Sequence, residues 1–131
     1  MESLHIPWYC SWVWPRSLEF WKIAKTALAP EHFSDQQYKT IAAQQFNCLT
    51  PENQIKWDAI EGNRGHKNYG PADQLVQYAQ MSGMKVRGHT LVWHSQVQAQ
   101  SGGWVNGLAK GELENVMKAH IRQVLKAVIL N

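Results

Sequence analysis

Two kinds of segment alternate along the chain from Ile23 onward: short apolar runs, and longer runs whose apolar residues recur at helical spacing. A short apolar run bounded by turn residues is typical of a buried strand, and helical spacing indicates an amphipathic helix. The expected strands are residues 23–29, 46–50 and 84–90. The expected helices are residues 34–45, 72–82 and about 112–129.

The first expected helix carries its own start signal. Ser34 followed by Gln37 is a capping box, in which each side chain bonds the other residue's backbone N–H. The core face of this helix is expected to hold Tyr38, Ile41 and Ala42, which fall on one side of a 3.6-residue repeat.

The second expected helix has signals at both ends. Pro71 stands near its first position, and Gly83 supplies the left-handed residue that ends it. Its apolar stripe is Ala72, Leu75, Val76 and Ala79. In the third helix, His120 falls on the apolar stripe, so we expect a core or core-edge histidine there.

Strands this short and apolar, each followed by a helix, favour an α/β fold with parallel strands. A (β/α)8 TIM barrel needs eight such units and about 250 residues, so the sequence predicts the first three β/α units of a TIM barrel, truncated. An open doubly wound sheet is the alternative fold. It is disfavoured because Ala27 to Pro30 follows the first strand, where that fold needs a glycine-rich phosphate loop.

Composition narrows the class of protein. The chain has 131 residues, of which 44% are hydrophobic and 18% charged, as in ordinary globular domains. Its net charge of +3 comes from lysines and arginines scattered singly, which argues against nucleic-acid binding. No apolar run reaches the length of a membrane helix. Cys48 lies in an apolar run and is expected to be a buried free thiol, while the state of Cys10 stays open.

The first 22 residues differ from the rest. They hold four of the seven tryptophans with neither strand nor helix periodicity, and they lack the basic start and cleavage site of a secretory signal. We therefore expect residues 1–22 to be a disordered leader of unclear origin, or sequence that does not belong to the domain, and residues 23–131 to be the partial barrel.

Polar residues follow two of the expected strands, at the edge where α/β proteins place their sites. The candidate binding residues are Glu52, Asn53, Lys56, His89, Trp93 and His94. Two histidines five apart suit neither strand nor helix geometry for a shared metal ion, so no metal site is expected. An indole beside an imidazole, with amide, carboxylate and ammonium groups nearby, instead suits a sugar, whose ring faces are apolar and whose edges carry hydroxyls.

One alternative to the sugar site stays open at this point. Glu52 and Lys56 could form an exposed pair four residues apart, worth about 0.2–0.5 kcal/mol. Glycoside cleavage needs two carboxyl groups, and only Glu52 directly follows a strand. The residues therefore predict a sugar-binding wall without the acid pair for cleavage.

Several stretches resemble the amino-terminal part of glycoside hydrolase family 10, the endo-β-1,4-xylanases built on a (β/α)8 barrel. They are Phe46-Asn47, Leu49 to Asn53, Lys56 to Asp58, Arg64-Gly65, Tyr69-Gly70, Ala72-Asp73 and Arg87 to Gln96. The resemblance covers about residues 23 to 126. A TPEN…KWD stretch followed by GHTLVWHSQ is far more specific than any single short motif.

The resemblance implies a role for each candidate residue. Glu52, Asn53 and Lys56 would bind the sugar one subsite away from the cleaved bond. His89 and Trp93 would line the subsite where the bond breaks, with His94 close behind.

The resemblance also implies where the catalytic residues belong. Family members hydrolyse xylan with retention, using a glutamate acid/base and a glutamate nucleophile in motifs that are not in this sequence. Both glutamates are therefore expected to belong to positions beyond Asn131, and no catalytic residue is expected within the chain.

The resemblance thus predicts an endo-1,4-β-xylanase by kinship that is inactive by itself. The expected partner is xylan or xylo-oligosaccharide, with no cofactor, and the expected location is extracellular although no signal peptide is evident. The alternative is a non-catalytic carbohydrate-binding fragment, and the choice between xylan and cellulose stays open.

Overall fold

The computed structural model describes residues 23–97 and 103–129. Two sequence-based expectations lie outside the described residues. One is the leader, residues 1–22, and the other concerns the end of the chain at Asn131, beyond which the catalytic glutamates were expected. Both stay predictions.

The strands are β1 (Lys25–Leu28), β2 (Cys48–Pro51) and β3 (Lys85–Val86). The helices are α1 (Gln36–Gln45), α2 (Trp57–Glu61), α3 (Gly70–Met81), α4 (His94–Val97) and α5 (Lys110–Val124). A 3₁₀ turn, Pro30–His32, follows β1, and a π-helical turn, Leu125–Ile129, continues α5.

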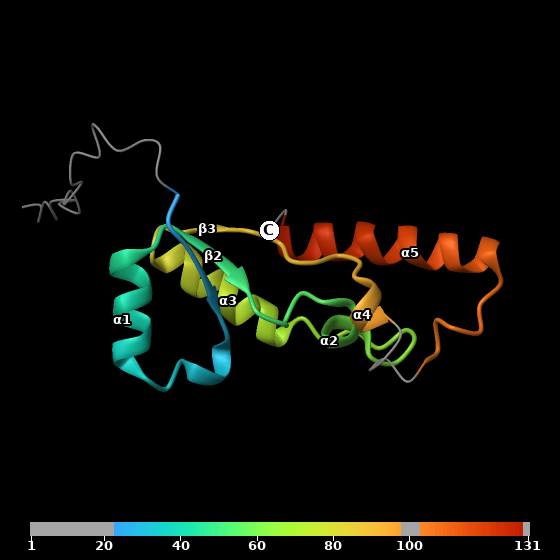
Figure 1. The fold of residues 1–131 in the computed structure, drawn as a ribbon, viewed down its shortest axis with the longest axis horizontal. Helices are drawn as coiled ribbons and strands as arrows, with labels where there is room; N and C mark the ends of the chain where they lie inside the picture. The colour runs from blue at the N-terminus through green and yellow to red at the C-terminus, as the bar shows by residue number, and fades with distance from the viewer. Residues whose placement is uncertain (1–22, 98–102, 130–131) are drawn as a thin grey trace, which may run out of the picture.

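The three strands form one parallel sheet in the order β1-β2-β3. The register pairs Lys25 with Cys48 and Cys48 with Lys85. Figure 1 shows β2 pointing toward α2 and α4, so the carboxyl edge of the sheet faces these two helices. Parallel strands alternating with helices confirm the predicted α/β fold. Within the described residues the outer edges of β1 and β3 have no strand partner.

The third strand is much shorter than predicted. Residues 84–90 were expected to be a buried strand, yet only Lys85 and Val86 pair with β2, and both side chains are exposed. Arg87 N–H still donates to Leu49 O at 2.8 Å. In this register the next N–H of β2 would come from residue 51, which is a proline and has none, so the ladder stops.

The start of α1 also differs from the prediction. Its N-cap is Asp35 rather than Ser34: the Asp35 carboxylate accepts from the backbone N–H of Gln37 at 2.8 Å and of Tyr38 at 3.2 Å. A carboxylate that reaches two unpaired amides at once is a strong cap. Ile41, expected in the core, is 47% exposed, because Tyr38 and Ala42 form the inward face.

The helix α3 follows its prediction closely. Pro71 lies in its first turn. Gly83 has φ +64°, the left-handed conformation that ends the helix and that glycine adopts without a Cβ clash. Its inward face packs under the sheet in the first apolar cluster. This cluster consists of Leu28, Ala42, Leu49, Leu75, Tyr78, Ala79 and Met84.

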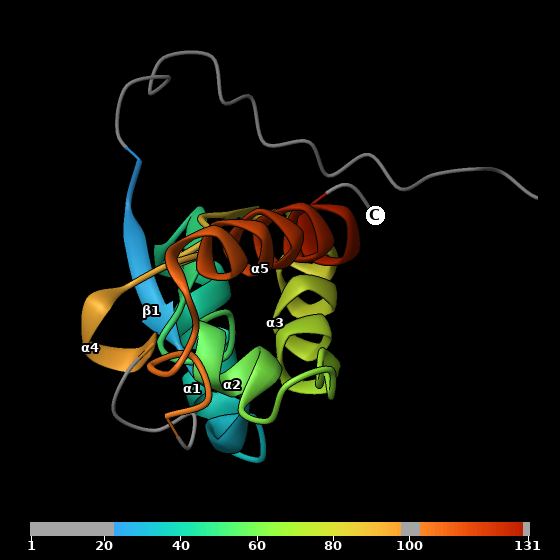
Figure 2. The same ribbon diagram turned by 90° about the vertical axis from the view of Figure 1, so that its right-hand side faces the viewer.

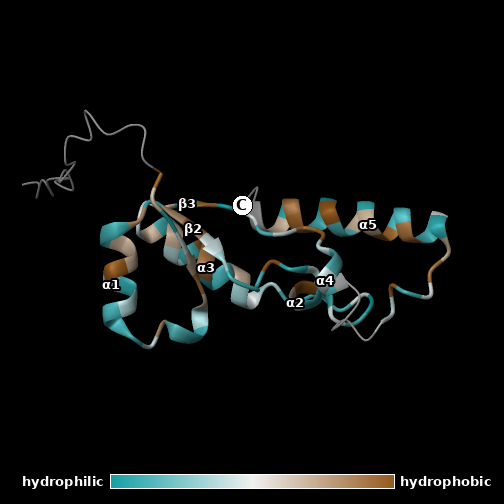
Figure 3. Ribbon diagram, in the orientation of Figure 1, coloured by the Kyte–Doolittle hydropathy of each residue, from teal (hydrophilic) through white to brown (hydrophobic). Residues whose placement is uncertain are grey.

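The second apolar cluster lies between α5 and the α2 region. It consists of Ile55, Ile60, Ala72 and Val124, with Leu91, Tyr69, Val76 and Ala127 packed against it. Figures 1 and 2 both place α5 above α2, and Figure 3 shows apolar and polar residues alternating along α5 at helical spacing. His120 is 1% exposed, which confirms a core position. No helix in the described ranges is long and apolar enough to span a bilayer.

Candidate functional site

The first wall segment, Glu52 to Lys56, begins where β2 ends. The backbone N–H of Glu52 donates to Leu28 O at 3.1 Å, which continues the pairing of β1 with β2 and fixes the start of the segment. The side chains of Glu52 and Asn53 are exposed. Lys56 differs, because it is only 9% exposed although it carries an ammonium group.

The Lys56 ammonium group joins two distant parts of the chain. Its Nζ donates to Asn53 Oδ1 at 2.8 Å and lies 4.7 Å from the centroid of the Trp93 ring. A cation over an indole face contributes about 0.5–2 kcal/mol, depending on how far water is excluded. The exposed Glu52–Lys56 pair left open by the sequence is not formed, since Lys56 contacts Asn53 and Trp93 instead.

The second wall segment, His89 to His94, carries three rings. The His89 and Trp93 ring centroids are 6.5 Å apart, and those of Trp93 and His94 are 6.0 Å apart with planes at 80°. Ser95 Oγ lies 3.1 Å from Nε2 of His94. The indole of Trp93 is 37% exposed, so it keeps apolar surface open to a ligand. His89 and Trp93 lie near each other although the segment that carries them is not a strand.

Five of the six candidate residues therefore lie in a continuous set of contacts: Asn53, Lys56, Trp93, His89 and His94. Glu52 makes no side-chain contact with the others. It acts instead on Tyr38, whose pKa is raised first by burial and then, to a smaller extent, by the charges of Glu52 and Glu31. Among the described residues, no three of His, Cys, Asp and Glu stand close enough to hold a metal ion.

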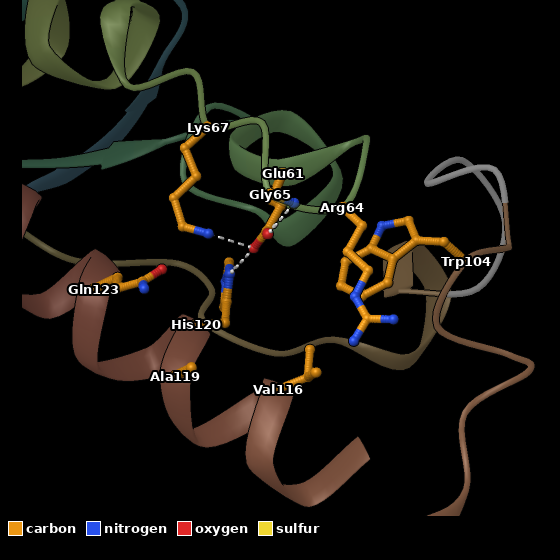
Figure 4. Close-up of a pocket in the computed structure, with 9 residues that line it drawn as sticks. All are labelled: Glu61, Arg64, Gly65, Lys67, Trp104, Val116, Ala119, His120 and Gln123. Carbon is orange, nitrogen blue, oxygen red and sulfur yellow. Dashed lines mark hydrogen bonds and ion pairs between the residues drawn. The ribbon is translucent and has the colours of Figure 1, made fainter. Parts of the chain in front are cut away.

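Behind this wall lies a buried polar network that was not singled out as functional from the sequence (Figure 4). Glu61 is its centre: Oε2 lies 2.8 Å from Lys67 Nζ and 3.5 Å from His120 Nδ1, and Oε1 accepts from Gly65 N–H at 2.9 Å. Trp57, which directly follows Lys56, stacks on the His120 ring with centroids 4.0 Å apart and planes 2° apart.

The spacing of residues along the sequence could have indicated only part of this network. Trp57 and Glu61 are four residues apart and so share a face of α2, which the sequence could have indicated. His120 was placed in the core, but nothing in the local pattern names the distant ring on which it stacks.

Burial and pairing set the protonation of this network. Burial lowers the pKa of His120, whereas Glu61 and the backbone of Leu91 act to raise it and Lys67 to lower it. For Glu61, burial alone would raise the pKa, but the bonds from Lys67, Gly65 and His120 outweigh it and hold the pKa below 4.5. At neutral pH the network therefore contains an ionised Glu61 and a neutral His120.

A cavity of about 250 Å³ opens beside the network, lined by Glu61, Arg64, Lys67, Trp104 and His120 together with side chains of α5. Figure 4 shows the Arg64 guanidinium group beside the Trp104 ring, and their separation is 5.7 Å. Arg64 is also paired with Glu112 at 2.6 Å, and Lys67 with Glu61. The charges around the cavity are thus already matched within the chain.

Comparison with known proteins supports the family and the architecture of the chain. The sequence profile of glycosyl hydrolase family 10 matches residues 17–129. A β-1,4-xylanase of Dictyoglomus thermophilum is 43% identical over 97 residues, which are 74% of this chain and 26% of that protein. Endo-1,4-β-xylanase B of Thermotoga neapolitana is 41% identical over 92 residues, 69% of this chain and 25% of that protein.

Solved structures of family 10 xylanases also match the chain. Xylanase 10B of Thermotoga petrophila RKU-1 in complex with xylobiose superposes with a TM-score of 0.69 at 40% identity, over 79% of this chain and 32% of that one. A psychrophilic family 10 endo-β-1,4-xylanase superposes with a TM-score of 0.72 at 31% identity, over 79% of this chain and 33% of that one.

The coverage shows how much of the barrel is present. The chain spans about a quarter of the curated relatives and about a third of the solved structures it matches. Its three parallel β/α units correspond to the first three units of the (β/α)8 barrel, which confirms the predicted barrel over the open sheet. The chain belongs to glycosyl hydrolase family 10.

Proposed function

We propose that this chain is the sugar-binding, amino-terminal part of an endo-1,4-β-xylanase, which hydrolyses internal β-1,4-xylosidic bonds of xylan with retention. Asn53, Lys56 and Glu52 bind the hydroxyl groups of one xylose unit. His89 and Trp93 line the adjacent unit at the cleaved bond, and His94 supports them. The proposed location, as for an enzyme acting on plant cell walls, is extracellular.

The observation that carries this proposal is the contact between Lys56 and Trp93. It joins the two wall segments, so hydrogen-bonding groups and an exposed aromatic face lie within a few ångströms of one another. Carbohydrate sites need this combination, because a pyranose offers apolar ring faces and polar edges. The relative of Thermotoga petrophila, solved with xylobiose, makes a xylose polymer the first ligand to test.

By itself the chain is proposed not to cleave xylan. Retaining hydrolysis needs an acid/base and a nucleophilic carboxylate about 5–5.5 Å apart. By resemblance these two glutamates belong to motifs that the 131 residues do not contain. General acid catalysis alone contributes about 10²–10⁴-fold, so their loss removes the reaction rather than slowing it slightly.

A carbohydrate-binding function without catalysis is the second candidate. It is favoured because Asn53, Lys56 and Trp93 contact one another within this chain, without any residue from elsewhere. On this second proposal the chain alone binds xylo-oligosaccharide reversibly.

One pair of measurements on the purified chain tests both proposals. Isothermal titration with xylotriose is expected to give saturable binding, and a reducing-sugar assay with xylan is expected to give no release. Trp93→Ala should weaken binding by about 2 kcal/mol, or roughly thirtyfold, as for a truncated aromatic anchor. Val92→Ala is the matched control, since Val92 is the exposed neighbour and is 40% exposed.

Each outcome has a distinct meaning. Xylan cleavage by the chain, surviving controls for contamination, would refute the proposed division between binding and catalysis. Absence of xylotriose binding would refute the autonomous binding function. Equal losses of affinity in Trp93→Ala and Val92→Ala would remove Trp93 from the site.

A further inference from the structure

We propose that His120 is a positioning residue for the sugar site: it holds the two wall segments in register, and thereby sets the contact between Lys56 and Trp93. It touches no ligand itself. The sugar-affinity part of this inference rests on the proposed function, whereas the positioning part can be tested without any sugar.

His120 lies against the first wall segment through Trp57. The two rings are stacked with a centroid distance of 4.0 Å and an interplanar angle of 2°. Trp57 is 2% exposed and is the residue after Lys56, so the plane of its indole fixes where the backbone of Lys56 enters α2. Movement of the His120 ring would therefore be passed directly to Lys56.

His120 also lies against the second wall segment. The backbone of Leu91, which stands between His89 and Trp93 in the sequence, lies close enough to the imidazole to act on the pKa of His120, which it raises. The Leu91 side chain packs against the second apolar cluster, which includes Ile55, the residue before Lys56. One buried ring is thus linked to both segments, through Trp57 to the first and through Leu91 to the second.

The third contact fixes the ring itself. Nδ1 of His120 lies 3.5 Å from Oε2 of Glu61, and the same oxygen is held at 2.8 Å by Lys67 Nζ. The His120 side chain is fully buried, and neither ring nitrogen makes a short hydrogen bond in the described residues. An apolar residue would fill the same space, so the presence of a polar ring between two acceptors indicates a role in orientation rather than in packing alone.

The positioning role is tested first in the absence of ligand. In the wild-type chain, the ε-methylene protons of Lys56 should resonate upfield, because the Trp93 ring current acts on the group above its face. His120→Phe keeps a flat ring on Trp57 but removes both nitrogens. It should retain a cooperative thermal unfolding transition and lose the upfield shift of Lys56.

The matched control is His66→Phe. His66 is exposed in the loop after α2, so the same chemical change there should leave the Lys56 resonance unchanged. Persistence of the upfield shift in folded His120→Phe would overturn the positioning role. If His120→Phe fails to fold, the more conservative His120→Gln is measured in the same way, with the same two outcomes.

Sugar affinity is measured second, by titration with xylotriose. His120→Phe should bind about fivefold more weakly than wild type, the scale expected when one buried polar interaction is lost, and His66→Phe should bind as tightly as wild type. Unchanged affinity in His120→Phe would overturn the inference. Loss of the Lys56 shift in His120→Phe, together with a wild-type chain that binds no xylotriose, would refute the proposed autonomous binding function and leave the positioning role standing.

Discussion

The two apolar clusters of the chain are held by different chemistry. The first cluster, under the sheet, is formed by side chains such as Leu28, Leu49 and Leu75, all 2% exposed or less. The second cluster also has apolar residues, but beside it lie Glu61 and His120, both nearly excluded from water. The first region is therefore stabilised mainly by apolar burial, with single hydrogen bonds between the tyrosines Tyr38 and Tyr78 and the backbone, and the second by burial together with a network of charged groups.

The two regions also differ in their relation to the candidate sugar site. Both wall segments of the candidate sugar site are attached to the second region, through Ile55, Trp57 and Leu91. An apolar cluster tolerates small shifts of its members, whereas a buried polar network has few satisfied arrangements. The region that must hold side chains in a fixed geometry is the region that uses directional contacts.

The largest expected effect lies in the first region. Leu49→Ala should lower the free energy of unfolding by about 2–5 kcal/mol, because Leu49 is 0% exposed in the central strand and its loss leaves a cavity. Urea unfolding at neutral pH measures this. Ile41→Ala on exposed α1 surface is the control and should stay within about 0.5 kcal/mol. Similar losses in both variants would mean that the sheet lacks a real core.

In the second region, Glu61→Gln should lower the free energy of unfolding by about 1.5–3 kcal/mol, the range for hydrogen bonds to a charged group. The change removes the charge that Lys67 and His120 share. Glu112→Gln breaks the exposed pair with Arg64 and should lose about 0–1 kcal/mol in the same urea titration. Equal losses in free energy of unfolding for the two variants would mean that the contacts of Glu61 contribute no more than an exposed ion pair.

Acidification should weaken the second region by a smaller amount. Burial holds the folded pKa of His120 below its usual 6.5, so the unfolded chain binds this proton more readily and stability falls as the pH drops below about 6.5. The folded pKa of Glu61 is below 4.5, so its contribution is lost only at lower pH, as the pH passes through that folded value.

Thermal unfolding of wild type and His120→Phe between pH 8 and pH 5 separates these windows. The wild-type melting temperature should decline below pH 6.5, and that of His120→Phe should decline less, because the variant has no proton to gain at this position. Parallel curves for the two chains would contradict a buried neutral His120.

The smallest expected effect is at the joint between the two wall segments. Lys56→Met keeps the aliphatic stem but removes the ammonium group over Trp93, and should lower the free energy of unfolding by about 0.5–1 kcal/mol. Lys85→Met, at an exposed lysine of β3, provides the comparison and should change little. An unchanged free energy of unfolding in Lys56→Met, or an equal loss in Lys85→Met, would mean that the ammonium group over Trp93 contributes nothing specific to stability.

Local signals predicted the elements well where the signal and its partner are close in sequence. Pro71, Gly83 and the apolar stripe between them fixed α3, and the apolar run around Leu49 fixed β2. The helix α1 was shifted because Ser34 and Asp35 are both good caps, and only the fold decides which one meets the free amides.

Features that depend on distant partners were not predictable. The early end of β3 follows from Pro51 on the neighbouring strand, and the stacking of Trp57 on His120 joins residues from separate helices. The candidate wall was recognised from the sequence because polar groups at strand ends share an edge in α/β folds. The Lys56–Trp93 contact itself required the structure.

The outer edges of β1 and β3, which pair with no strand in the described part of the chain, have a consequence for how copies of the chain meet. Each outer strand opens with an exposed lysine, Lys25 in β1 and Lys85 in β3. Positive charges at such edges repel the matching edge of a second molecule. The distance over which these charges repel falls from about 10 Å in 0.1 M salt to about 3 Å in 1 M salt. Association of two copies through their sheet edges is therefore expected to be weaker at low salt than at high salt.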